Sequence, residues 1–221
     1  MEAKPTVGLL PLYVSLYDKV RPEARSAFSP LLARVRRGFE DLGVAVVSSG
    51  VCCVREDFVR AVRLFEGESV DLIVTLHLAY SPSGEAINAL LGTSLPLLML
   101  DTTMDFGFGH EVDPSRLMYN HGIHGVQDLA SVCRRRRRPF QIVAGHIDES
   151  NVLGRAADVS RAARAANRMK QTLALRIGAP FEGMSDFAVS EDVLVSRLGI
   201  RLDQISPWDL ARSEERRVGK E

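Results

Sequence analysis

Two histidines three residues apart are the most distinctive chemical feature of this sequence of 221 residues. His121 and His124 stand in the segment Asn120-His121-Gly122-Ile123-His124-Gly125, at the expected start of a helix. A helix N-terminus offers backbone N–H groups without intrahelical partners, and an imidazole can donate or accept a hydrogen bond. The segment therefore predicts a site that binds hydroxyl groups.

Two other interpretations of the histidine pair stay open at this point. Histidines at positions i and i+3 can share one face of a helix and bind a metal ion. No carboxylate or cysteine clearly completes such a site, so the residues favour hydroxyl binding over metal binding. Alternatively, Asn120 caps the helix and the two imidazoles bond to carbonyl groups of the preceding loop.

The elements that must position these residues alternate along the chain. Continuous apolar runs are typical of strands buried on both faces, and apolar residues at helical spacing predict helices between them. This alternation predicts an α/β fold with a doubly wound parallel sheet, similar to flavodoxin or Rossmann domains. The expected strands are 6–12, 44–48, 70–76, 96–100, 140–144 and 172–177, and the expected helices are 22–42, 55–65, 83–91, 122–137 and 151–170.

Ligands of such sheets bind at the carboxyl ends of the strands. Here these ends are 11–17, 77–83, 101–108 and 145–149. His77 stands at one of them, where its imidazole either points into a pocket or bonds to the backbone. Ser81 or Ser83 is the expected cap of the helix that follows.

Three regions are expected along the chain. Residues 1–170 form the first α/β domain, and 171–211 form the start of a second α/β domain that is left incomplete. Residues 212–221 match, residue for residue, a translation of a common sequencing-adapter oligonucleotide, so we expect a non-native tail there. We therefore expect the natural protein to continue beyond Ala211.

Composition excludes several classes of partner. Lys plus Arg equals Asp plus Glu at 28 each, and no apolar run is long enough to span a bilayer, so neither nucleic acid nor a membrane is an expected partner. The run 134–138 consists of five arginines without interleaved aromatic residues, and we expect a solvated helix end there. Cys52, Cys53 and Cys133 have no metal-binding spacing, and the adjacent Cys52 and Cys53 are expected to be small buried residues in a reducing compartment, the cytoplasm.

Three segments carry a resemblance to a known family. Residues 120–129 with 138–146 (NHGIHGVQDL and RPFQIVAGH) resemble a helix-and-strand segment of L-arabinose isomerases, where an Asn-Gln-x-x-His-Gly version occurs. Residues 76–90 resemble the His-x-Phe-Ser-Pro segment of these enzymes, and residues 176–200 resemble the opening of their central domain. The chain is thus similar to the N-terminal part of the L-arabinose and L-fucose isomerases, over residues 6–210.

The resemblance implies an activity for the full-length protein. These enzymes interconvert aldoses and ketoses by moving a proton between C1 and C2, assisted by a divalent metal ion, typically Mn²⁺. In the family, the glutamates and histidines that hold the metal lie later in the chain. We therefore expect no catalytic residue and no metal ligand among these 221 residues, and no activity of this chain alone. The resemblance also implies a homo-oligomer whose active sites are shared between subunits.

The residues that match the motifs are the expected contacts to a small-molecule sugar. His124 matches the motif histidine that contacts substrate, and Tyr80 matches the aromatic residue before Ser-Pro. His121 stands where the arabinose enzymes have Gln, and a Gln-containing loop near Pro11 is missing here. The predicted sugar-binding set is His124, His121, Tyr80, Asn120 and His77. A non-catalytic sugar-binding or regulatory α/β module remains the alternative function.

Overall fold

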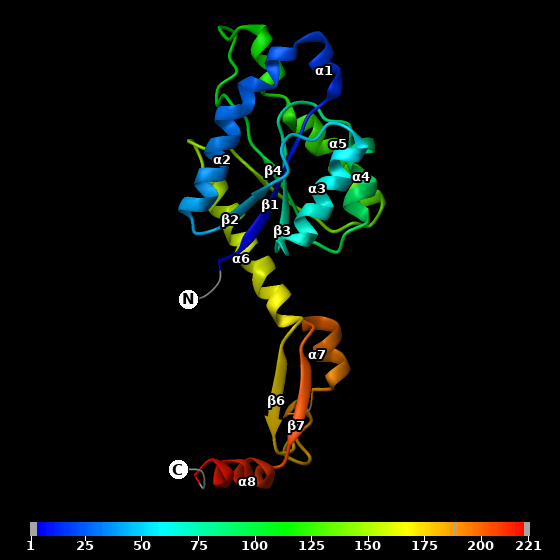
Figure 1. Cartoon of the computed structure of the whole chain (residues 1–221), viewed down its shortest axis with the longest axis vertical. Helices are drawn as coiled ribbons and strands as arrows, with labels where there is room; N and C mark the ends of the chain where they lie inside the picture. The colour runs from blue at the N-terminus through cyan, green and yellow to red at the C-terminus, as the bar shows by residue number, and fades with distance from the viewer. Residues whose placement is uncertain (1–3, 188, 219–221) are drawn as a thin grey trace. The chain divides into compact units, whose positions relative to one another are not determined.

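Five parallel strands form the central sheet of this protein, in the order β2-β1-β3-β4-β5 (Figure 1). The computed structural model describes residues 4–187 and 189–218, and the contacts divide the chain into two units after Arg164. The strands of the first unit are β1 (Thr6–Leu12), β2 (Ala45–Ser48), β3 (Leu72–His77), β4 (Leu97–Asp101) and β5 (Gln141–Ala144). Because the order reverses between β1 and β3, the sheet is doubly wound, and the predicted α/β fold is confirmed.

Helices cover both faces of this sheet. Helices α2 (Ser29–Asp41) and α6 (Val152–Met169) pack on one face, where Leu9, Val74 and Leu100 are buried. Helices α3 (Arg55–Gly67), α4 (Ser83–Leu91) and α5 (Gly122–Arg135) pack on the other face. Alternate residues of each central strand thus enter two separate apolar clusters, which explains why the strands read as continuous apolar runs.

The segment after β1 differs from its prediction. A single helix over 22–42 is wrong, because the regular helix α2 begins at Ser29 and is preceded by two short 3₁₀ turns, η1 (Pro22–Ala24) and η2 (Ser26–Phe28). Pro30 lies in the first turn of α2 and has no N–H to continue a helix from the preceding residues. A short helix that the sequence did not predict, α1 (Ser15–Val20), follows β1 directly.

The cap of α4 also differs from its prediction. Neither Ser81 nor Ser83 caps this helix with its side chain. Instead, the Asp128 carboxylate on α5 accepts a hydrogen bond from the Ser83 N–H at 2.8 Å. The neighbouring helix therefore supplies the cap, which also ties α4 to α5.

Two predictions about side chains had different outcomes. Arg134 to Arg137 are exposed as expected, but Arg138 is not simply solvated. Its guanidinium donates hydrogen bonds to the carbonyl groups of Leu90, at 3.1 Å, and Leu95. Arg138 therefore satisfies a backbone acceptor near the C-terminus of α4. The expectation that Cys52 and Cys53 are buried is confirmed, and Cys133 is buried as well.

The second unit begins another α/β layer. Strands β6 (Leu173–Ile177) and β7 (Arg201–Ile205) pair in parallel, with η4 (Ser185–Phe187) and helix α7 (Glu191–Leu198) between them. Alternate residues of β6, Leu173, Leu175 and Ile177, are more than half exposed. Helix α8 (Pro207–Val218) follows, so the region predicted as a tail is helical up to Val218, and residues 219–221 lie outside the described part. No helix in the described ranges has both the length and the apolar character needed to cross a membrane.

Candidate functional site

The histidine segment lies where the sheet changes direction. The chain leaving β1 and the chain leaving β3 diverge at this point, and the crevice between such strands is the usual ligand site of doubly wound sheets. Leu12 at the end of β1 pairs with His77 at the end of β3. The start of α5 lies against both chain segments, because Gly122 packs on His77 and the His121 ring bonds to Tyr17.

Two glycines let α5 approach the end of β3 closely. A methyl group at Gly122 would lie 2.2 Å from the His77 carbonyl oxygen, and one at Gly125 would lie 2.5 Å from the His77 Nδ1. These glycines are three residues apart and therefore share the buried face of the helix. Their role in the motif is structural, because any side chain there would push the histidine segment away from the sheet.

His77 is buried beneath this contact. It is 3% exposed, and its Nδ1 lies 2.7 Å from the Ser81 hydroxyl oxygen. Burial lowers the pKa of His77 to about 3, so the imidazole is neutral at physiological pH. Its Nε2 is buried without a partner among the described residues. The imidazole thus bonds to a side chain rather than to the backbone, and it does not line the cavity beside the histidine pair.

His121 is held at both ring nitrogens. Its Nδ1 lies 2.7 Å from the Leu117 carbonyl oxygen. Its Nε2 lies 3.1 Å from the Tyr17 hydroxyl oxygen and accepts a hydrogen bond from the Tyr80 N–H at 3.3 Å. Burial lowers the pKa of His121, which favours the neutral imidazole.

His124 is the exposed member of the pair. Its Nδ1 donates to the His121 carbonyl oxygen at 3.2 Å, since a carbonyl can only accept. Its Nε2 has no hydrogen-bond partner in the described part of the chain and is an acceptor in the neutral ring. The side chain can therefore accept a hydrogen bond from a hydroxyl group of a ligand.

Asn120 is bonded to Asp105 rather than to the helix. Its amide Nδ2 donates to the Asp105 carboxylate at 2.6 Å and to the Arg116 carbonyl at 3.0 Å, and its Oδ1 accepts from the Asp105 N–H at 2.9 Å. The alternative in which Asn120 caps α5 is wrong, since the residue at the cap position is His121. The other half of that alternative is confirmed, because both histidines bond to carbonyl groups.

Asp105 also joins the two ends of the loop between β4 and α5. The Arg116 guanidinium donates to both carboxylate oxygens at 2.8 Å. Burial raises the pKa of Asp105, but the hydrogen bonds from Asn120 and Arg116 outweigh burial and lower it overall. This contact holds η3 (Pro114–Tyr119) against the segment that follows β4.

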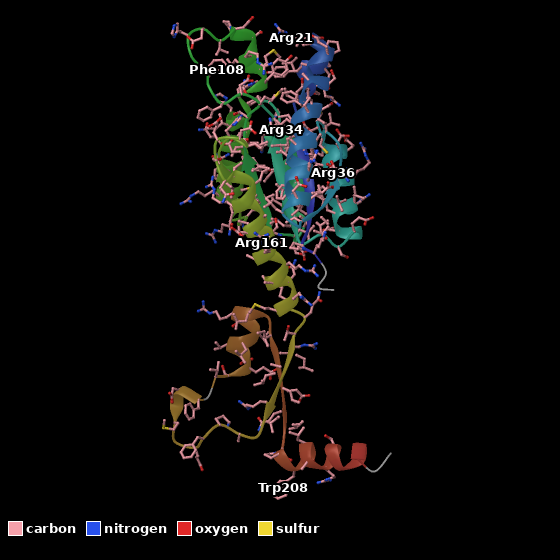
Figure 2. All side chains as sticks on the ribbon, turned by 90° about the vertical axis from the view of Figure 1, so that its left-hand side faces the viewer. Arg21, Arg34, Arg36, Phe108, Arg161 and Trp208 are labelled. Atoms are coloured by element: carbon pink, nitrogen blue, oxygen red, sulfur yellow. The ribbon has the colours of Figure 1, made fainter. Side chains whose placement is uncertain are left out.

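A cavity of about 300 Å³ opens beside the histidine pair. Its volume is at the lower end of the range for small-molecule sites. Phe106 and Phe108 are 70% and 52% exposed, and Figure 2 shows Phe108 on the loop that ends at η3. The lining combines polar and apolar residues: Thr103, Asp105, Phe106, Phe108, Leu117, Asn120, His121, Ile123 and His124.

The structure therefore brings together only part of the predicted set. His121, His124 and Asn120 line the cavity, whereas Tyr80 contributes its backbone N–H to His121 and does not line it. Tyr17, Asp105 and Phe106 lie in the expected strand-end segments 11–17 and 101–108 but were not among the predicted site residues. Their position at strand ends was the available signal, but no pattern linked Tyr17 to a residue more than one hundred positions away.

The residues present do not fit a metal ion. In residues 4–187 and 189–218, no group of three or more His, Cys, Asp or Glu side chains could hold one. Within the histidine pair, both nitrogens of His121 already have protein partners and the Nδ1 of His124 bonds to a carbonyl, so the pair offers one imidazole nitrogen, the Nε2 of His124.

We expect Asp105→Asn to open the loop between β4 and α5. The variant loses the charged acceptor for the Arg116 guanidinium. Because the side chains of Asp105 and Arg116 are about one third exposed, we expect a loss of about 1 kcal/mol of unfolding free energy. Trypsin should then cleave faster after Arg116. Asp113→Asn is the matched control, because the exposed Asp113 carboxylate accepts from Ser115, two residues further along the chain. Equal cleavage rates in the two variants would contradict this role of Asp105.

Comparison with known proteins finds a matching family over most of the first unit. The family model of the L-arabinose isomerase N-terminal domain matches residues 32–171. L-arabinose isomerase of Acidothermus cellulolyticus is 28% identical over 145 residues, which are 64% of this chain and 28% of that protein. The enzyme of Pectobacterium carotovorum is 26% identical over 150 residues, which are 66% of this chain and 28% of that protein. The chain thus aligns with little more than a quarter of each relative.

Likeness to solved structures is weaker. A periplasmic solute-binding protein from Actinobacillus succinogenes with bound D-allose aligns with 92% of this chain and 59% of that chain. The identity is 13% and the TM-score is 0.29, too low to indicate a common fold.

Proposed function

Because the chain belongs to the family of L-arabinose isomerase N-terminal domains, we propose that it is the sugar-binding N-terminal part of a longer aldose–ketose isomerase. The observation that carries this proposal is the cavity beside His124, whose Nε2 is a free acceptor. Sugar hydroxyl groups are donors that suit this nitrogen. The aromatic side chains of Phe106 and Phe108 offer apolar faces on which the C–H groups of a sugar ring can pack.

We propose that the catalytic groups and the ligands of the divalent metal ion, proposed to be Mn²⁺, belong to a later part of the natural protein. The metal would polarise the carbonyl and the adjacent hydroxyl of the sugar. Because the described residues do not fit a metal ion, the contribution of this chain is to bind and orient the sugar and to shield it from water. Incubation of the purified chain with L-arabinose and Mn²⁺ should form no ketose.

A homo-oligomer with shared active sites is part of the proposal. The rim of the cavity is apolar, and Phe106, Phe108, Leu117 and Ile123 are between 43% and 70% exposed. Exposed apolar residues that gather on one part of the surface are typical of a surface that contacts another protein. We propose that this rim faces a neighbouring subunit, and that the oligomer works in the cytoplasm, where the three free cysteines stay reduced.

The experiment that tests the sugar site is a titration with L-arabinose, followed by NMR signals of the histidine rings. We expect a saturable shift of the His124 signals, and an affinity at least tenfold lower in His124→Ala, because the ring supplies the free acceptor. His110→Ala is the matched control, because this exposed histidine lies in the loop between β4 and α5 but does not line the cavity. D-arabinose tests stereospecificity. No saturable response to L-arabinose, or equal affinity in the two variants, would contradict the proposal.

A further inference from the structure

The partners of His121 determine where its proton lies. The Leu117 carbonyl can only accept, so the Nδ1 at 2.7 Å must carry the proton. The Tyr80 backbone N–H can only donate, so the Nε2 at 3.3 Å must be an acceptor. The Tyr17 hydroxyl, 3.1 Å from the same Nε2, then donates to it as well. All these partners are satisfied together only by the neutral ring protonated on Nδ1.

We propose that His121 is a positioning residue that aligns His124, and that Tyr17 fixes it in place. The ring of His121 joins three segments: α1 through Tyr17, the chain after β3 through the Tyr80 N–H, and η3 through Leu117. With both nitrogens occupied, the ring has no free polar atom for a ligand. Only the expected effect on sugar affinity rests on the proposed function.

The link to His124 runs through the backbone of His121. The His121 carbonyl oxygen accepts from the backbone N–H of His124 and from its ring Nδ1, both at 3.2 Å. If His121 shifts, this carbonyl shifts with it, and the His124 ring loses the acceptor that holds its Nδ1 proton. His124 would then no longer present Nε2 as a fixed acceptor toward the cavity.

Glutamine offers the same hydrogen-bonding pattern as this form of His121. Its side-chain amide has donor N–H groups and an acceptor oxygen, which match the protonated Nδ1 and the free Nε2. The related motif with Asn-Gln-x-x-His-Gly has glutamine at this position. The His121 departure from that motif therefore retains a donor and an acceptor at this position.

The first test needs no sugar. Long-range correlation of ring protons with ring ¹⁵N nuclei, at neutral pH, reports which nitrogen of each histidine carries the proton. We expect His121 and His124 both to be protonated on Nδ1, although an imidazole in water favours the proton on Nε2. Replacement of each histidine by glutamine assigns the signals. A proton on Nε2 of His121 would overturn the proposal, whatever the result with L-arabinose.

The second test compares variants by their affinity for L-arabinose. His121→Phe keeps an aromatic ring but removes the hydrogen-bond donor and acceptor, and this variant should bind L-arabinose at least tenfold more weakly. His121→Gln should stay within about threefold of the natural protein, and Tyr17→Phe should lose about three- to tenfold, as expected for one hydrogen bond. Tyr17→Phe should also shift the ¹⁵N signal of the His121 Nε2.

The outcomes separate the two proposals. If the natural chain does not bind L-arabinose, the proposed function fails, while the proton positions still test the role of His121. If the natural chain binds and His121→Phe binds equally well, the positioning role is overturned and the sugar site stands. If His121→Phe does not fold, the variants His121→Gln and Tyr17→Phe replace it in the test. Unchanged ¹⁵N signals of the His121 ring in a folded Tyr17→Phe protein would overturn the proposal.

Discussion

Gly122→Ala is expected to lose about 3 kcal/mol of unfolding free energy, the upper end for an overpacked core site. The added methyl group would lie 2.2 Å from the carbonyl oxygen of His77 and 3.1 Å from its carbonyl carbon. These are backbone atoms at the end of a central strand, which pairs with β1 on one side, so they cannot move aside as a flexible side chain would. Helix α5 must therefore shift, and the histidine pair shifts with it.

Urea unfolding curves of the two proteins would measure this loss. Gly84→Ala is the matched control, because Gly84 also lies in the first turn of a helix and a methyl group there would meet no atom within 4 Å. That variant should lose no stability, since alanine favours helix more than glycine does. Equal stabilities of the two variants would show that α5 does not depend on this close approach.

The unfolding free energy should fall steeply as the pH drops below about 6.5, and His77 should be a main cause. The pKa of His77 is about 3 in the folded protein because burial disfavours the charged ring, whereas the unfolded chain titrates near the ordinary value of 6.5. Between these values the unfolded state binds a proton that the folded state does not. Stability is therefore complete above pH 6.5 and is lost toward pH 3, by up to about 1.4 kcal/mol per pH unit.

Comparison with His77→Gln isolates this contribution, because carboxyl groups also titrate at the lower end of the range. Glutamine retains a donor and an acceptor for Ser81 but does not ionise. The difference in unfolding free energy between the two proteins should change by about 2 kcal/mol from pH 6.5 to pH 4.5. Parallel stability curves for the two proteins over this range would contradict the assignment to His77.

Most of the first unit could be predicted from the sequence. Its central strands are buried on both faces, so runs such as Leu72–His77 have no exposed residue and are mostly apolar. Such runs are recognisable in the sequence as strands, and their order along the chain can be read directly. The prediction of one helix over 22–42 is wrong because the apolar spacing continues across Pro30, although proline prevents one continuous helix there. Helix α1 has no buried residue and therefore no periodic apolar signal.

The site was predictable only in its location. Glycines and histidines in one short segment indicated a binding region, but their roles depend on partners that lie far away in the sequence. In the sequence, Asn120 stands at a position typical of the N-cap of a helix, yet the Asp105 carboxylate lies close enough to bind its side-chain amide. Ser81 likewise could have capped α4, but the buried His77 takes its hydroxyl. In both cases a tertiary contact replaced the local hydrogen bond that the residue type favours.

The contacts around His121 have a consequence for the order of folding. The hydrogen bond to Tyr17 joins residues 104 positions apart, and that to the Tyr80 N–H joins residues 41 positions apart. Contacts of such high sequence separation form slowly, because the intervening chain loses entropy before the contact contributes any stability. During synthesis, β1 and β3 can pair before α5 has left the ribosome. The cavity is thus completed late, after the sheet on which it rests.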